Sequence, residues 1–381
     1  MDKSEPAYDA SDEYRPEPEP IPEPPSWQDG SFRIGIHTSI AGDIAGALDI
    51  ASKLGANALQ IFSASPRMWP RGGTRIAEAD AARFRARRAE LGLGPLVIHD
   101  NYLINLASPD RVMRTRSILA FHDELVRAVS LGADFLVAHP GAGLGSQKSQ
   151  AISEIAQGMR QAARGMKLGD LRILVENTSG MGSAVGARFE EIKTILDETR
   201  DLPMGVCLDT AHTFEAGYDI TTEEGLGRTL DLVERTVGLD RVYVLHVNDS
   251  KTPLGSRVDR HEHIGRGKIG LEAFRRILNH PRLGPGLQGL AGRAFILETP
   301  IDLPGDDRRN VRALWDLVGV DPKQAPEAVD GFSMARRKKI SSRKPQRTQR
   351  KKAKGKKVGA KKRKGGSKFG NLTSEIEKER T

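Results

Sequence analysis

The sequence predicts a (β/α)8 barrel, a closed ring of eight parallel strands surrounded by helices, and three observations support this fold class. Eight short apolar runs recur along the chain between polar segments, as strands buried on both faces do. Segments with helical spacing of their apolar residues separate the runs. Most runs end on a residue that can bind a metal, and barrel strands carry site chemistry at their carboxyl ends. We therefore expect an α/β protein of the TIM-barrel class.

The expected strands are the apolar runs themselves, and from the third run onward each is followed by His, Asp or Glu. They are 32–36 before His37, 58–62 before Ser63, 95–98 before His99, 135–138 before His139, 173–175 before Glu176, 204–208 before Asp209, 242–245 before His246 and 295–297 before Glu298. Because parallel barrel strands all end at the same mouth, these side chains are expected to meet there. The pattern predicts one multinuclear metal centre.

Helices are expected between the strands, at 43–54, 78–91, 112–131, 149–166, 189–199, 223–237, 271–278 and 308–318. In the first of them, Ile44, Ala47, Leu48 and Ala51 recur at the spacing of one helix face. The alternation of strand and helix predicts parallel pairing with right-handed crossovers.

The charged residues divide the 381-residue chain into three segments. Residues 1–30 are rich in Pro and Glu and have a net charge of −7, whereas residues 331–381 have a net charge of +17. Since the whole chain has a net charge of +9, the residues between them carry −1. We expect a disordered acidic segment over 1–30, the barrel over 31–320 and a disordered Lys/Arg-rich tail over 321–381.

No segment predicts export or insertion into a membrane. The first 30 residues are acidic, unlike a signal peptide, and no apolar stretch approaches the roughly 18 residues of a membrane span. The single cysteine, Cys207, lies inside an apolar run and has no disulfide partner, so we expect it to be an inert core residue. These features favour an intracellular protein.

The residues that end the strands provide ligands for a dinuclear pair: His99, His139, Glu176, Asp209, His246 and Glu298. Glu176 can bridge two metals through its two oxygens. A third metal is suggested by His212, which lies three residues after Asp209 on the loop expected to leave that strand, together with Asp259 and His261. Asp259 and His261 can act together because side chains two apart on an extended segment point the same way. Mixed His and carboxylate ligands suit Zn²⁺, with Mn²⁺ as the alternative at one site.

The other histidines are expected to have no ligand role. His122 falls within a helical pattern, His280 lies beside a proline, and His263 is out of step with His261. His37 ends the first apolar run and is expected to line the pocket.

The predicted ligand set suits a phosphate ester as substrate. Three divalent ions with four carboxylates would give the centre a formal charge of about +2, where the carboxylates alone would give about −4. Two metals about 3.5–4 Å apart can activate water and stabilise both the attacking and the departing oxygen of an in-line displacement.

Nine motifs resemble the endonuclease IV family of apurinic/apyrimidinic (AP) endonucleases, which are zinc-dependent TIM barrels. They are 35–39 (GIHTS), 99–106 (HDNYLINL), 139–141 (HPG), 176–178 (ENT), 205–212 (GVCLDTAH), 246–251 (HVNDSK), 255–261 (GSRVDRH), 265–270 (GRGKIG) and 297–299 (LET). The resemblance covers nearly the whole barrel, and both ends of the chain lie outside it.

The resemblance implies three zinc ions and assigns all nine ligands: His99, His139 and Glu176 to the first; Glu176, Asp209, His246 and Glu298 to the second; His212, Asp259 and His261 to the third. It implies hydrolysis of the phosphodiester 5′ to an abasic site, leaving a 3′-OH, in base excision repair. It also implies 3′-phosphatase and 3′-phosphodiesterase activity on blocked 3′ ends.

The resemblance also implies residue roles. Hydroxide between the first two zinc ions would attack phosphorus, the third zinc would stabilise the departing 3′ oxygen, and the catalytic residues Glu176 and Glu298 would orient the pair. Arg67, Tyr102 and Leu103 match positions that wedge into DNA, and extrusion is least costly where no base is stacked.

The expected partner is double-stranded DNA with abasic sites or blocked 3′ ends. The basic tail is expected to contact DNA phosphates without sequence preference. We expect a monomer that is cytoplasmic and nucleoid-associated, or nuclear in a eukaryotic host. A further hypothesis is that the acidic segment over 1–30 folds back on the tail and weakens this binding, which deletion of the segment tests.

Two alternatives remain open. A sugar isomerase or epimerase on the same barrel would also gather His, Asp and Glu at strand ends, but such enzymes need fewer metals than His212, Asp259 and His261 imply. A non-catalytic DNA-binding protein could use the barrel as a scaffold, but the complete ligand sets argue against it. Zinc content separates the first alternative from the AP endonuclease.

Overall fold

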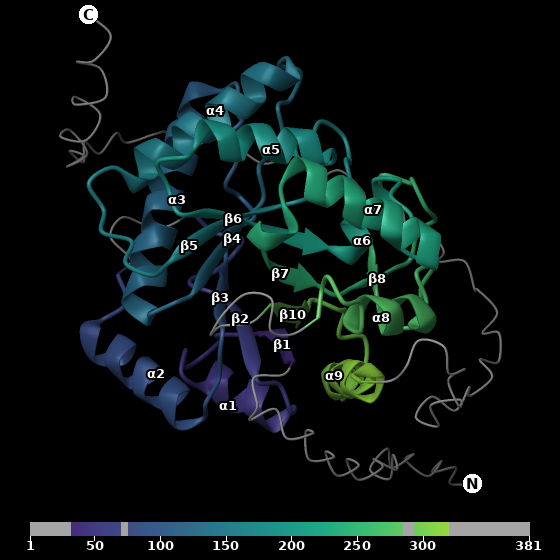
Figure 1. The fold of residues 1–381 in the computed structure, drawn as a ribbon. Coiled ribbons are helices and arrows are strands. Elements are labelled where there is room, and N and C mark those ends of the chain that lie inside the picture. Colours follow the sequence, from purple (N-terminus) through teal and green to yellow (C-terminus); the bar gives the residue numbers. More distant parts are fainter. Residues whose placement is uncertain (1–31, 70–74, 285–292, 320–381) are drawn as a thin grey trace, which may run out of the picture. The chain divides into compact units, whose positions relative to one another are not determined.

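Eight parallel strands close into a barrel, in the order β1-β10-β7-β6-β5-β4-β3-β2, and helices surround it (Figure 1). The computed structural model describes residues 32–69, 75–284 and 293–319. The strands are β1 (Arg33–Thr38), β2 (Ala58–Phe62), β3 (Leu96–His99), β4 (Phe135–Ala138), β5 (Arg172–Glu176), β6 (Met204–Asp209), β7 (Val242–His246) and β10 (Ala294–Leu297). The predicted fold class is therefore confirmed, with each expected strand present.

The helices lie where the sequence predicts them, to within a few residues at each end. They are α1 (Gly46–Lys53), α2 (Glu78–Glu90), α3 (Arg111–Leu131), α4 (Lys148–Ala163), α5 (Phe189–Glu198), α7 (Glu223–Thr236), α8 (Leu271–Leu278) and α9 (Asp306–Leu317). The predicted segments 1–30 and 321–381 lie outside the described residues.

Several short elements were not expected. The six-residue helix α6 (Thr210–Glu215) follows β6 directly, and the 3-10 turn η1 (Leu239–Arg241) precedes β7. The strands β8 (Asp249–Ser250) and β9 (His261–Glu262) form a small antiparallel pair. The expectation that His212 lies on a loop is wrong, because the Asp209 side chain accepts a hydrogen bond from the His212 amide and starts α6.

Alternation of side chains along each strand separates two apolar layers. The inner layer consists of Ala58, Val97, Phe135, Val137, Leu174, Cys207, Val244, Ala294 and Ile296. Residues between these positions, such as Ile98, Ile173 and Leu245, pack in the larger layer between barrel and helices. Since side chains two apart share a face, the residue two positions after an inner-layer residue also points inward.

Close approach of the strands depends on glycine at one point of the ring. A Cβ atom at Gly35 in β1 would overlap the Ile296 side chain and would lie 2.9 Å from the Ala58 backbone. A glycine therefore lets β1 pack between β10 and β2, its two neighbours in the barrel. Among the described residues, no helix is long and apolar enough to cross a membrane.

Candidate metal centre

Glu176 lies at the centre of the clustered ligands, fully buried at the end of β5. Its Oε2 atom is 3.4 Å from His99 Nε2 and 3.2 Å from His139 Nε2. Its Oε1 atom is 3.0 Å from His246 Nδ1. Each oxygen thus faces a different set of side chains, which is the arrangement that a carboxylate bridging two metals requires.

Ligand atoms of eight of the nine predicted residues converge at the barrel mouth in three groups. The atoms of each group lie within 4.8 Å of one another, and the groups are His99, His139 and Glu176; Glu176, Asp209, His246 and Glu298; Asp209, His212 and His261. Glu176 joins the first two groups, and Asp209 joins the last two. The structure therefore brings together residues that are up to 199 positions apart in the sequence.

Asp259 belongs beside the third group. Its Oδ2 atom is 3.2 Å from His212 Nε2, and its Oδ1 atom is 3.6 Å from His261 Nε2. The Asp259 side chain is 39% exposed, whereas His212 is buried. The third group therefore opens toward solvent on the side where Asp259 lies.

Oxygen acceptors fix one ring nitrogen in four of the five clustered histidines. The Nδ1 atoms of His99, His212 and His261 lie 2.9–3.2 Å from the backbone oxygens of Asp100, Asn177 and Glu298, respectively. In His246 the fixed atom is Nε2, 2.8 Å from Gln60 Oε1. A nitrogen that donates to oxygen keeps its proton, so the other nitrogen faces the cluster and is the one available to a metal.

The ligand set fits divalent cations, because two buried polar atoms in it have no hydrogen-bond partner. Glu176 Oε2 and His261 Nε2 are buried and have no hydrogen-bond partner among the described residues. An unpartnered buried carboxylate oxygen is costly, and a cation would satisfy it. Imidazole and carboxylate donors together suit Zn²⁺ or a similar ion.

The electrostatics of the cluster favour positive charge. Burial lowers the pKa of His99, but its interactions with Glu176 and Glu298 outweigh this and raise that pKa to about 10. Burial raises the pKa of Glu176, but the charges of His139 and His246 outweigh this and lower it well below its usual range. The Glu176 carboxylate thus remains ionised and favours positive charge in the site.

Four buried residues that sequence reasoning missed support the ligands. Gln60 contacts Glu298 and His246, and Asn177 accepts from the Asp209 amide at 2.7 Å. Asn248 donates to Asp209 Oδ2 at 2.6 Å and accepts from the Glu298 amide. Glu215 holds the segment that carries Asp259. A polar residue inside an apolar run, as Gln60 is, was the signal available in the sequence.

His37 also lines the centre, as expected, without approaching as a ligand of any of the three groups. Its Nδ1 atom is 2.9 Å from Gln60 Nε2 and 3.6 Å from Glu298 Oε1, and its ring packs 4.4 Å from Phe62.

The three residues expected to contact DNA lie on two neighbouring loops at the mouth. Tyr102 is 59% exposed and its ring centroid is 5.1 Å from that of Phe62, while Arg67 is exposed and Leu103 is half-buried. Buried Asn101 links the loops by donating to the backbone oxygens of Ser65 and Met68 at 2.9 and 3.0 Å. Both loops are therefore held together beside His99.

A separate group, formed by Glu262, His263 and Asp302, does not fit a metal. Asn310 accepts from the Ile264 amide through Oδ1, so its Nδ2 faces His263 Nδ1 at 3.0 Å as a donor. The His263 proton is therefore on Nε2, which lies 3.5 Å from Asp302 Oδ2. Because its lone pair already accepts a hydrogen bond from Asn310, His263 is a hydrogen-bonded structural residue.

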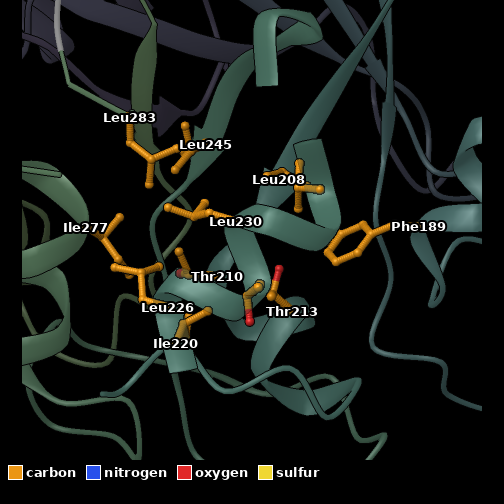
Figure 2. A pocket seen from close by; sticks show the side chains of 12 residues that line it. Phe189, Leu208, Thr210, Thr213, Ile220, Leu226, Leu230, Leu245, Ile277 and Leu283 are labelled. Carbon is orange, nitrogen blue, oxygen red and sulfur yellow. The ribbon is translucent and has the colours of Figure 1, made fainter. Parts of the chain in front are cut away.

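An apolar cavity lies away from this chemistry, between the barrel wall and α6, α7 and α8 (Figure 2). Its volume is about 30 Å³, and its lining includes Leu208, Leu230, Leu245 and Ile277, with Thr210, Thr213 and Thr229 as the polar members. A cavity without a titratable side chain offers no group for catalysis. It is a gap in helix packing and is separate from the candidate centre.

The fold and the ligand groups define a TIM barrel with a candidate metal centre at the carboxyl ends of its strands. A family model described as xylose isomerase-like TIM barrel matches residues 48–314. A probable endonuclease 4 of Solibacter usitatus (strain Ellin6076) is 49% identical over 294 residues, which are 76% of this chain and 97% of that protein. Endonuclease 4 of a Thermus thermophilus strain is 43% identical, covering 74% of this chain and 97% of that protein.

Comparison with solved structures also points to endonuclease IV. The crystal structure of endonuclease IV from Thermus thermophilus has a TM-score of 0.65 and 42% identity, covering 75% of this chain and 98% of that one. A D-psicose 3-epimerase has a TM-score of 0.51 at 14% identity over 74% of this chain and 90% of that one, which shows a common fold alone. The chain belongs to the endonuclease 4 family, whose members are metal-dependent enzymes that hydrolyse DNA phosphodiester bonds in repair.

Proposed function

We propose that this protein is an AP endonuclease that hydrolyses the phosphodiester 5′ to an abasic site, leaving a 3′-OH. We include in the proposal the removal of phosphate and other blocking groups from 3′ ends, which is hydrolysis of a similar phosphoester. The observation that carries it is the joining of three ligand groups through Glu176 and Asp209. Family membership supports DNA as the substrate.

We propose that the three groups hold three divalent ions, with zinc at each and Mn²⁺ as the alternative at one. Glu176 would be shared by the first two positions, and Asp259 would complete the third with His212 and His261. Bound ions would lower the pKa of water toward neutrality and neutralise the charge of the phosphodiester. One chain supplies all nine ligands, which supports action as a monomer.

The protein's own groups position this chemistry. Glu176 directs one oxygen to each of the first two groups, so it fixes their separation. Glu298 keeps Oε1 against Gln60 at 2.5 Å and presents Oε2 toward His246. Since both carboxylates are immobilised by buried partners, little reorganisation is needed when the substrate binds.

Selection of an abasic site is proposed to depend on the two mouth loops. The exposed Tyr102 ring, the half-buried Leu103 side chain and the exposed Arg67 would wedge into the DNA and fill the gap left by the missing base. An intact nucleotide has a stacked base to unstack, so its extrusion costs more. The hydrogen bonds of Asn101 hold the two loops beside each other for this role.

The decisive experiment is cleavage of an end-labelled duplex that carries one tetrahydrofuran abasic analogue, with an intact duplex beside it. We expect one nick on the 5′ side that leaves a 3′-OH, abolished by chelation and restored by zinc. Absence of cleavage by the zinc-replete protein would refute the proposal, and turnover of a ketose or its phosphate would favour the epimerase alternative.

A second part of the proposal concerns the basic tail, which lies outside the described residues. Residues 336–368 contain eighteen Lys or Arg and no Asp or Glu, so they are expected to bind DNA phosphates without sequence preference. Replacing Lys361, Lys362, Arg363 and Lys364 with Gln should lower the salt dependence of binding to intact duplex by a slope of roughly 3–4. An unchanged slope would show that these charges do not reach the DNA.

A further inference from the structure

Gln60 is a fully buried amide in the middle of an apolar strand, and it contacts two of the clustered ligands. It lies in β2 two positions after the inner-layer residue Ala58, so it points into the barrel. Its Nε2 atom donates to Glu298 Oε1 at 2.5 Å, and its Oε1 atom is 2.8 Å from His246 Nε2. Because both polar atoms of this buried amide contact candidate metal ligands, we expect Gln60 to act in the metal centre.

Only one orientation of the amide is compatible with these contacts. A flipped amide would place its oxygen against the Glu298 carboxylate, which would bring two acceptors to within 2.5 Å. Nε2 must therefore face Glu298, and it also donates to His37 Nδ1 at 2.9 Å. The amide oxygen must then accept from His246, so the ring proton of His246 is on Nε2.

The same contacts leave one donor atom of each ligand free for the cluster. With Nε2 held by the Gln60 amide, His246 presents Nδ1 to the cluster, where this atom lies 3.0 Å from Glu176 Oε1 and 3.2 Å from Glu298 Oε2. Because the Gln60 amide donates to Oε1 of Glu298, the Oε2 atom of Glu298 is the one available to the cluster. His246 differs here from His99, His212 and His261, whose fixed nitrogen is Nδ1 and faces backbone oxygen.

We propose that Gln60 is a positioning residue for the Glu176, Asp209, His246 and Glu298 group, selecting Nδ1 of His246 and Oε2 of Glu298 as the metal-binding atoms. The inference rests on the proposed metal-dependent function. One side chain sets two of the four ligands of this group. Its loss therefore disturbs this group and leaves the other two ligand groups intact. Hydrogen-bond partners of ligands typically change metal affinity by about 10–100-fold when removed.

The test compares two variants of Gln60 with a control in the same part of the chain. Gln60→Met keeps the length of the side chain but removes both the amide donor and the amide acceptor, and Gln60→Ala removes the volume as well. The control is Asn57→Ala, since Asn57 is equally buried just before β2 but its side chain bonds to backbone atoms of Ile34 and Phe32.

Zinc affinity is measured by competition with a chromophoric chelator, zinc content by elemental mass spectrometry, and coordination by the visible spectrum after Co²⁺ substitution. We expect Gln60→Met and Gln60→Ala to bind one ion about 10–100-fold more weakly, with an altered Co²⁺ spectrum, and Asn57→Ala to match the wild type. Unchanged affinity in Gln60→Met would overturn the inference, because it would reduce Gln60 to a space-filling residue.

The result separates the two proposals. A wild-type protein that binds three ions but does not nick abasic DNA would refute the proposed function and leave the role of Gln60 to be decided by its variants. A wild-type protein that binds no ion would overturn both.

Discussion

Asp209 and His246 are Cα partners across the neighbouring strands β6 and β7, so their side chains leave the barrel wall at the same level. On the other side of β7, His246 pairs with Ile296 of β10, and Glu298 follows two residues later. The strand register therefore sets the spacing of the second ligand group. A slip of one residue in any of these strands would turn a ligand out of the barrel.

Replacing Glu176 with Gln should abolish most activity and reduce the number of bound ions. The substitution removes the negative charge shared by two ligand groups, and several kcal/mol of lost stabilisation correspond to a decrease of about a thousandfold in rate. Cleavage rate and zinc content are measured together. Glu190→Gln, on the exposed side of α5, is the control and should match the wild type.

Metal binding should release protons at neutral pH and should strengthen as pH rises. The pKa of His99 in the metal-free chain is raised to about 10, so the ring is protonated at pH 7 and must lose its proton to become a ligand. Each proton released makes affinity rise with pH up to that pKa. Calorimetry in two buffers of different ionisation enthalpy counts the protons, and a buffer-independent heat would contradict this account.

Removing the Tyr102 ring should weaken recognition of an abasic duplex but not of an intact one. The exposed ring packs edge-on against Phe62 and 5.9 Å from His99, which places it beside the centre. Loss of an aromatic stacking surface costs about 1–3 kcal/mol, so Tyr102→Ala should lower affinity roughly 10-fold or more. Fluorescence anisotropy with both duplexes checks this, and Tyr102→Phe should retain binding.

Glu215→Ala should weaken the third ligand group selectively. Glu215 Oε1 accepts from Ser250 Oγ at 2.6 Å and from the Arg260 amide at 3.2 Å, and so holds the segment that leads to Asp259 and His261. Without the hydrogen bonds of Glu215, Asp259 and His261 are less well positioned. We therefore expect about a tenfold loss of affinity for one ion. Chelator competition measures it, with the exposed Glu224→Ala as the control. An equal loss of metal affinity in all three ligand groups would instead indicate that the whole protein is destabilised.

Leu230→Ala should lower stability without changing metal content. Leu230 is buried beside the cavity between α7 and the barrel, so truncation enlarges an existing gap (Figure 2). Such changes cost about 3–5 kcal/mol. Denaturant unfolding gives the change in free energy, and elemental analysis tests the metal. A loss of zinc in this variant would show that the cavity wall supports the centre.

Much of the fold was predictable because its signal is local. The run 135–138 was expected as a strand and forms β4 with the same bounds, since a short apolar run between polar residues has few other stable conformations. Helix α6 was not expected, because six residues are too few to show a helical period. It begins where it does because the Asp209 side chain caps it.

The sequence by itself determined the barrel and the residue types gathered at its mouth, because strand ends that carry His, Asp or Glu must converge when parallel strands close into a ring. Only the tertiary structure decided which atoms of those residues face one another. Gln60 illustrates the difference: its hydrogen bonds reach residues 186 and 238 positions away, and no local pattern encodes contacts of that range. Hydrogen-bond direction is set by three-dimensional packing, so the choice between the two nitrogens of His246 became visible only in the folded chain.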